Sequence, residues 1–211
     1  MAASKENRTI SQFKSRLAGG GARPNLFEVE LTLDGEGLGF SLPGYDATQM
    51  AFLCKAANLP AQNIASIDVP FRGRIFKVAG DRTIDTWTIT IINDEDFVLR
   101  TAFEKWSDKM SNLIDATGVT NPTSYMTNAF VKQLGRGATV ASTTNEGGTS
   151  SVLRTYKFYD IWPSEVSAIE LSYDNTDTVE EFTVTFQVQY FTIGETDDSA
   201  DGDETQGTDA G

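Results

Sequence analysis

The sequence of 211 residues contains no histidine and a single cysteine, Cys54. Histidine is the commonest general base and metal ligand in proteins, so its absence excludes the serine and cysteine triads that depend on imidazole. One cysteine excludes an internal disulfide framework and a zinc site with several cysteines, and it fits assembly in a reducing cytosol. We interpret Cys54 as a small buried apolar residue, because no histidine exists to activate it. These absences weigh against an enzyme.

Long hydrophobic runs are also missing. No stretch of 18 apolar residues occurs anywhere, and the first ten residues, MAASKENRTI, lack the apolar run of a signal peptide. We therefore expect no membrane span and no membrane partner. The hydrophobic content of 39% is nonetheless ordinary for a folded domain with a core.

Positive charge is scarce, with 17 lysine and arginine residues against 30 aspartate and glutamate residues, a net charge of −13. Seven of these carboxylates and none of the basic residues fall in residues 195–211, so the rest of the chain carries −6. Residues 195–211 are rich in Asp, Gly, Thr and Ser and lack large apolar side chains, which predicts a mobile acidic tail. The acidic balance also argues against a protein that grips DNA through its phosphates.

Apolar and polar residues alternate with a period of two in several segments, which is typical of strands with one buried face. The clearest segment is 182–190, where Phe, Val and Tyr alternate with Thr and Gln, and segment 87–91 alternates with threonines in the same way. Further strands are predicted at 26–33, 130–134, 152–159 and 166–173, the last joined to 182–190 by a turn at 174–177. One-sided strands favour antiparallel sheets, so the predicted fold is mainly β, an antiparallel sandwich or barrel.

Two segments have a helical period. In the first, apolar residues recur at steps of four and three: Leu99, Phe103, Trp106, Met110 and Leu113. This stripe predicts one amphipathic helix that flanks the β core. A shorter stripe of Ile10, Phe13 and Leu17 predicts an N-terminal helical arm in residues 1–22, too weak to fold alone and so expected to dock. We therefore divide the chain into this arm, a β domain at 23–194 and the acidic tail at 195–211.

The segment KVAGDRTIDTWTITIINDED, residues 77–96, carries charged groups at both ends. The tripeptide at 80–82 lacks the glycine spacing and lysine of a phosphate loop and precedes a strand, so we interpret it as a turn. Asn93 and Asp94 fall between a strand and the predicted helix, and we interpret them as the helix cap, with a cation site as the alternative. Asp81 and Asp85 permit an acid-catalysed hydrolase, but no aromatic platform for a sugar accompanies them.

Residues 197–208 partly match a calcium-binding loop, the second metal site that the sequence suggests. Asp197, Ser199 and Asp201 match its first half, but Thr208 stands where a bidentate glutamate is needed. We therefore expect neither a metal nor a cofactor.

Basic residues gather at Arg72, Arg74, Lys77 and Arg82, after a strand-like stretch at 67–69. Such a run is either a solvated strand face or a set of ion-pair partners for the carboxylates of a neighbouring copy, since the arginine fork suits interfaces.

Five blocks carry a resemblance: RPNLF (23–27), CKAANLPA (54–61), VAGDRTIDTWTITIINDED (78–96), IWP (161–163) and FTVTFQVQYF (182–191). Together and in this order they resemble the tail tube protein of contractile-tailed bacteriophages. The match spans residues 23–191, and its most specific part is VAGDRT followed by Trp and NDE. The chain departs from the family pattern at 37–49, at the Gly- and Thr-rich 135–151, and in the acidic tail.

The resemblance implies a β-sandwich with a flanking helix, which forms hexameric rings stacked into a tube inside a contractile sheath. It implies a structural virion protein, not an enzyme, that is assembled in the host cytoplasm and conducts DNA into the host. The implied partners are other copies of itself, the tail sheath protein, the baseplate proteins that initiate the tube, the tape measure protein and the tail terminator, with double-stranded DNA passing through unbound. The alternative is the inner tube of a contractile injection system that delivers protein effectors.

Residue roles follow as hypotheses. The polar strand faces are expected to include the residues that line the channel, with contact to solvent or to the sheath as the alternative: Thr183, Thr185, Gln187, Gln189, Thr86, Thr88 and Thr90. The resemblance also implies that the region 69–77 and the N-terminal arm contact other subunits. The expected inter-subunit residues are Arg72, Arg74, Lys77, Asp81 and Arg82.

Overall fold

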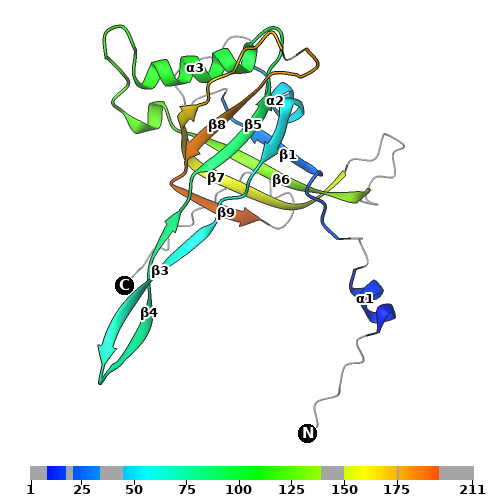
Figure 1. The fold of residues 1–211 in the computed structure, drawn as a ribbon, viewed down its shortest axis with the longest axis vertical. Helices are drawn as coiled ribbons and strands as arrows, with labels where there is room; N and C mark the ends of the chain where they lie inside the picture. Colours follow the sequence, from blue (N-terminus) through cyan, green and yellow to red (C-terminus); the bar gives the residue numbers. More distant parts are fainter. Residues whose placement is uncertain (1–8, 18–20, 34–44, 139–149, 175, 195–211) are drawn as a thin grey trace, which may run out of the picture. The chain divides into compact units, whose positions relative to one another are not determined.

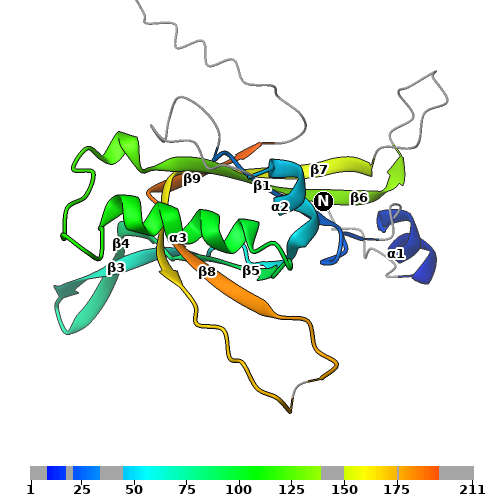
Figure 2. The ribbon, with the colours of Figure 1, turned by 90° about the horizontal axis from the view of Figure 1, so that it is seen from above.

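The computed structural model describes residues 9–17, 21–33, 45–138, 150–174 and 176–194 (Figures 1 and 2). The acidic tail at 195–211 and most of segments 37–49 and 135–151 lie outside the described residues. The elements follow in this order: α1 Ile10–Arg16, β1 Phe27–Leu31, α2 Ala47–Leu53, β2 Cys54–Ala57, β3 Gln62–Phe71, β4 Arg74–Ile84, β5 Trp87–Ile92, α3 Val98–Met110, η1 Pro122–Ser124, β6 Thr127–Ala138, β7 Ser150–Val166, β8 Glu181–Gln187 and β9 Tyr190–Gly194.

The chain divides into two compact units. The first comprises residues 1–27, 132–155 and 193–211, and the second comprises 28–131 and 156–192. In the first unit, the Thr9 hydroxyl caps α1 by accepting from the backbone N–H of Gln12. The Gln133 side chain donates to the carbonyl oxygens of Arg23 and Leu26. The side chains of α1 are all exposed, and the docking of an N-terminal arm stays a prediction.

Most strands belong to one sheet, in the order β1-β6-β7-β8-β5-β2, with β9 also paired to β7. The pairings β7 with β8, β8 with β5 and β5 with β2 are antiparallel. The sheet curls into half a barrel, so the prediction of a mainly β, antiparallel fold is confirmed. β3 and β4 pair only with each other among the described strands and form a separate hairpin.

The core of the second unit lies between the sheet and α3. Trp87 of β5 stacks between Phe158 and Phe186, with ring centroids 4.7 and 5.2 Å away. α3 lays Phe103 and Trp106 against Phe186, at centroid distances of 6.0 and 6.1 Å. These large aromatic side chains are fully buried and supply much of the apolar area removed from water. The predicted flanking helix is therefore present and faces the core with the predicted stripe.

The stripe of α3 is shorter than predicted. The helix ends at Met110, and Leu113 is exposed in the following loop. Side chains compete with the helical hydrogen bonds here, because Asn112 Oδ1 accepts from the backbone N–H of Ile114 at 2.8 Å and Asp108 accepts from that of Leu113. The expectation that Leu113 packs on the core is wrong.

Two strand predictions need correction. The predicted strand at 182–190 is two strands, since β8 ends at Gln187 and β9 begins at Tyr190. The predicted strand at 166–173 is wrong, because β7 ends at Val166 and the described residues of 167–180 form no strand. Figure 2 shows this connection, between β7 and β8, extending away from the sheet.

No helix in the described part of the chain is long and apolar enough to cross a membrane.

Candidate functional site

The polar sides of β5 and β8 form one surface, which we call the threonine face. The antiparallel register sets Thr88 opposite Thr185 and Thr90 opposite Thr183. The hydroxyl oxygens of Thr88 and Thr185 lie 3.4 Å apart, the length of a weak hydrogen bond. The residues that alternate with these threonines are buried against α3 and the other strands. Because strand side chains alternate between faces, the threonines lie on the side away from the core.

Five of the seven residues expected to line a channel share this face. They are Thr88, Thr90, Thr183, Thr185 and Gln187. Thr86 precedes β5 and Gln189 lies between β8 and β9, and both are exposed outside the strands. Strand pairing therefore brings five together and leaves two at the ends. That any of them faces a channel stays a prediction.

The charges on the threonine face nearly cancel. Lys55 of β2 pairs with Glu181 at the start of β8, with Nζ 2.5 Å from Oε1. Glu165 of β7 lies opposite Thr185. The ion pair is largely solvated and contributes about 0–1 kcal/mol to stability. The carboxylate of Glu181 nevertheless neutralises the positive charge of Lys55. The face offers hydroxyl and amide groups with little net charge.

The hairpin of β3 and β4 turns at Arg72 and Gly73, between the paired residues Phe71 and Arg74. Both turn residues have positive φ, 46° and 80°, as a two-residue type I′ turn requires. The hairpin extends away from the curled sheet (Figure 1), and every residue of β3 is exposed. A two-stranded ribbon with both edges open is marginal in water. Another surface is needed to stabilise it.

One side of the hairpin is apolar. The register sets Ile67 opposite Val78 and Val69 opposite Phe76, with Phe71 next along the same side. These five residues, which we call the apolar hairpin face, have exposed fractions from 41% for Val78 to 66% for Phe76. The sequence analysis predicted the basic residues of this segment but not its apolar side. The apolar residues at 67, 69 and 71 and at 76 and 78 were the available signal.

The residues expected at subunit contacts lie on or beside this ribbon. Lys77 pairs across the strands with Asp68, Nζ to Oδ1 at 3.0 Å, so this lysine is already satisfied. The Arg72 guanidinium lies 5.5 Å from the centroid of the Phe71 ring. The three others are Arg74, Asp81 and Arg82, which are exposed and form no ion pair within the described residues.

The tripeptide at 80–82 lies inside β4, so its prediction as a turn is wrong. A β-bulge between Ile64 and Ser66 brings the β3 backbone against Gly80. A Cβ atom at Gly80 would stand 3.1 Å from both the Ala65 carbonyl oxygen and Ile67 Cγ1. The glycine therefore serves close strand packing, as at other bulges.

The prediction that Asn93 and Asp94 cap the flanking helix is also wrong. α3 begins after Phe97, which adopts φ 53° and offers no side-chain cap. Asn93 Nδ2 instead donates to Glu180 Oε2 at 2.7 Å, and Asp94 accepts from Gln49 Nε2 at 2.8 Å. The backbone carbonyl of Asp94, not its carboxylate, accepts from the N–H of Phe97. These side chains tie neighbouring loops together.

The residues considered for catalysis or metal binding have environments that favour a structural role. Burial raises the pKa of the Cys54 thiol to about 12, so the reactive thiolate is suppressed at neutral pH. Both carboxylate oxygens of Asp85 accept from Asn63 Nδ2, at 3.1 and 3.0 Å. Among the described residues, no group of three His, Cys, Asp or Glu side chains is placed to hold a metal ion.

Comparisons with known proteins bear on these surfaces. The family model "Phage tail tube protein" matches residues 22–194. The chain is 31% identical over 170 residues to tail tube protein gp19 of Enterobacteria phage T4, covering 81% of this chain and 90% of that protein. The gp19 of Enterobacteria phage T6 matches equally well, at 31% over 170 residues.

Among solved structures, the sheath/tube terminator of an extracellular contractile injection system, PVC, shares the fold at a TM-score of 0.54 and 12% identity. The match covers 82% of this chain and 96% of that one. The tube terminating cap of the anti-feeding prophage shares it at a TM-score of 0.53 and 16% identity, over 83% and 92% of the two chains. The chain therefore belongs to the phage tail tube protein family, whose members have a structural and not a catalytic role.

Proposed function

We propose that this chain is the repeating subunit of the inner tube of a contractile phage tail, and that its copies form stacked hexameric rings around a channel for DNA. The observation that carries the proposal is the apolar hairpin face, on a chain of the tail tube family. A structural subunit must bury such a face against another copy. In an isolated subunit the five side chains remain about half exposed.

Burial of the apolar hairpin face contributes favourable free energy to assembly. Complete burial of a large apolar side chain stabilises by about 1.5–3 kcal/mol, so covering five half-exposed ones contributes roughly 5 kcal/mol per copy. Association also costs side-chain and rigid-body entropy. One hairpin contact is therefore too weak alone, and a tube in which every subunit repeats it is stable while the free subunit stays soluble.

The threonine face is the proposed channel wall. Lys55 is neutralised by Glu181, so the charge left among its named residues is the single carboxylate of Glu165. A basic wall would bind phosphates with release of counterions, which holds DNA in place. A polar and nearly neutral wall lets the duplex slide. The opposite sides of β5 and β8 are occupied by the core, which supports this choice of face.

The proposed partners follow from the family and from the neighbours in fold. A PVC structure is a complex of sheath and tube, another is a sheath/tube terminator, and an anti-feeding prophage structure is a baseplate. We extend sheath, baseplate and terminator contacts to this chain, together with a tape measure protein inside the tube. Assembly would take place in the host cytoplasm. The phage relatives at 31% identity favour a virion. The alternative, an injection device, is supported only by likeness of fold.

Cysteine labelling of assembled tubes tests the channel wall. Thr90→Cys places a thiol on the proposed wall, and Lys105→Cys places one on the exposed side of α3. The high pKa of buried Cys54 keeps the native thiol from competing. In tubes, a small maleimide should react with both variants, whereas a maleimide on a large polymer should react only at position 105. Equal reaction of the polymer at both positions would contradict the assignment.

A further inference from the structure

The connection between β7 and β8 is an exposed segment that the proposed channel does not use. We call residues 168–174 and 176–180 the β7–β8 connection. Its ends are fixed, since Arg100 Nη1 donates to the Ser167 carbonyl at 2.6 Å and Asn93 holds Glu180. Between these anchors Leu171 is 86% exposed, and Tyr173 and Val179 are also exposed. Three large apolar side chains in one surface segment mark an interaction site.

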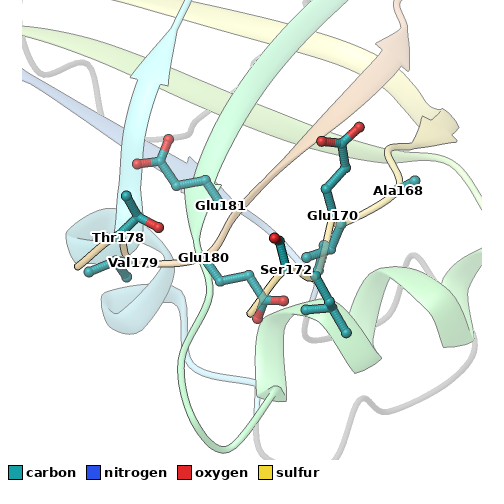
Figure 3. Close-up of a pocket in the computed structure, with 9 residues that line it drawn as sticks. Ala168, Glu170, Ser172, Thr178, Val179, Glu180 and Glu181 are labelled. Atoms are coloured by element: carbon teal, nitrogen blue, oxygen red, sulfur yellow. The ribbon is translucent and has the colours of Figure 1, made fainter. Parts of the chain in front are cut away.

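The two arms of the connection, together with Glu181, border an open hollow of about 520 Å³. Figure 3 shows Thr178 and Val179 on one side of it and Ser172 and Glu170 on the other. Its volume falls within the range of about 300–1,000 Å³ typical of binding pockets. The lining combines apolar side chains with carboxylates, so it suits a partner that presents an apolar side chain beside a cation: Ile169, Leu171 and Val179, and Glu170, Glu180 and Glu181.

The hairpin has those properties. Its residues 62–84 carry four basic and two acidic side chains, whereas the β7–β8 connection carries four carboxylates and neither Lys nor Arg. At the hairpin tip Phe71, the last residue of the apolar hairpin face, precedes Arg72 and lies opposite Arg74, which forms no ion pair within the described residues. Charge and apolar character are therefore complementary between the two surfaces.

Both surfaces belong to the second unit, and one copy cannot bring them together. Figures 1 and 2 both show the hairpin tip and the β7–β8 connection well apart. Two different patches that meet between copies make a head-to-tail contact, which closes into a ring or continues as a helical filament. We propose that the hairpin tip of one copy docks into the β7–β8 connection of another. This inference rests on the proposed self-assembly and names the surface that receives the hairpin.

A charge exchange in the full chain tests the pairing. The variant R72E/R74E makes the hairpin tip acidic, and E170R/D174R places two arginines on the connection and reduces its net charge from −4 to zero. Each variant alone should raise the protein concentration needed for polymerisation by roughly tenfold or more, because like charges then face each other. A mixture of the two variants, or one chain with all four changes, should recover much of the loss. Light scattering and negative-stain electron microscopy measure the polymerisation of each variant. K105E is the control, and circular dichroism checks that each variant folds.

Cross-linking supplies an independent readout. R74C protein mixed with T178C protein should give a heterodimer with a short bismaleimide, whereas R74C mixed with K105C should not. Tubes that form normally from R72E/R74E or E170R/D174R, or tubes in which R74C and T178C never cross-link, would overturn the pairing and leave self-assembly intact. Unmodified protein that forms no assembly in any condition would instead overturn the proposed function, and the pairing with it.

Discussion

Replacing Phe76 by alanine should weaken tube assembly without weakening the fold. Phe76 is 66% exposed on the apolar hairpin face, so the monomer loses little buried area. Full burial of phenylalanine is worth about 1.5–3 kcal/mol, and two thirds of this is about 1–2 kcal/mol for each contact. Since 1.4 kcal/mol is a factor of ten, the critical concentration for polymerisation should rise roughly 5- to 30-fold. Sedimentation of assembled protein over a concentration series measures it.

The matched control is Ile75→Ala. Ile75 is adjacent in β4 and 64% exposed, but it lies on the opposite side of the ribbon. Its replacement should change the critical concentration by less than about threefold, and urea unfolding of both variants should match the unmodified chain within about 0.5 kcal/mol. If the two variants raise the critical concentration equally, or if neither does, the apolar hairpin face is not the contact surface.

Four further outcomes are expected. Trp87→Ala should lower the free energy of unfolding by about 3–5 kcal/mol in urea titrations, because Trp87 stacks in the centre of the core. Trp87→Phe should cost clearly less, since it also removes a buried indole N–H that has no hydrogen-bond partner among the described residues. Asp68→Asn should change thermal stability by less than about 1 kcal/mol, because its ion pair with Lys77 is well exposed. Between pH 9.0 and about 12 the unfolded Cys54 thiol ionises and the folded one does not, so stability should fall as pH rises; Cys54→Ala should flatten this part of the pH profile in chemical denaturation. Removal of residues 195–211 takes seven carboxylates from each copy, so low-salt polymerisation should begin at a lower concentration; unchanged polymerisation with lost sheath attachment would point to a sheath contact instead.

The parts of the fold that the sequence predicted well are those in which each strand or helix has its partner in the same chain. The alternation at 87–91 and 182–187 became the buried and polar sides of β5 and β8, because the core and α3 cover one side only. The threonine face followed directly, since a two-residue period places threonines together once the strands pair in register.

The errors arose where partners outside the segment decide the structure. Val188 continues the alternation of β8, but the next strand, β9, pairs with β7. The predicted strand is therefore interrupted between Gln187 and Tyr190. Leu171 and Tyr173 alternate with polar residues as a strand would, yet both are exposed and the segment forms no strand. Alternation with a period of two indicates that one side of a segment is apolar. It does not indicate whether the surface that packs on this side belongs to the same chain or to another copy.

Local polar groups explain the remaining misses. Asn93 and Asp94 have the composition of a helix cap, but Phe97 takes the left-handed conformation and starts α3 three residues later. Their side chains then bond to Glu180 and Gln49, residues far along the chain, which a local motif does not reveal. The tripeptide at 80–82 has turn composition, but its glycine is required by close packing at a bulge.

Electron microscopy of the purified full chain, concentrated in low-salt and physiological buffers, tests the central claim most directly. The account predicts hollow tubes built from stacked rings, in which the hairpin of each subunit contacts another subunit and the threonine face lines the channel. Protein that remains monomeric and monodisperse in every condition, or tubes whose density places α3 against the channel, would contradict it.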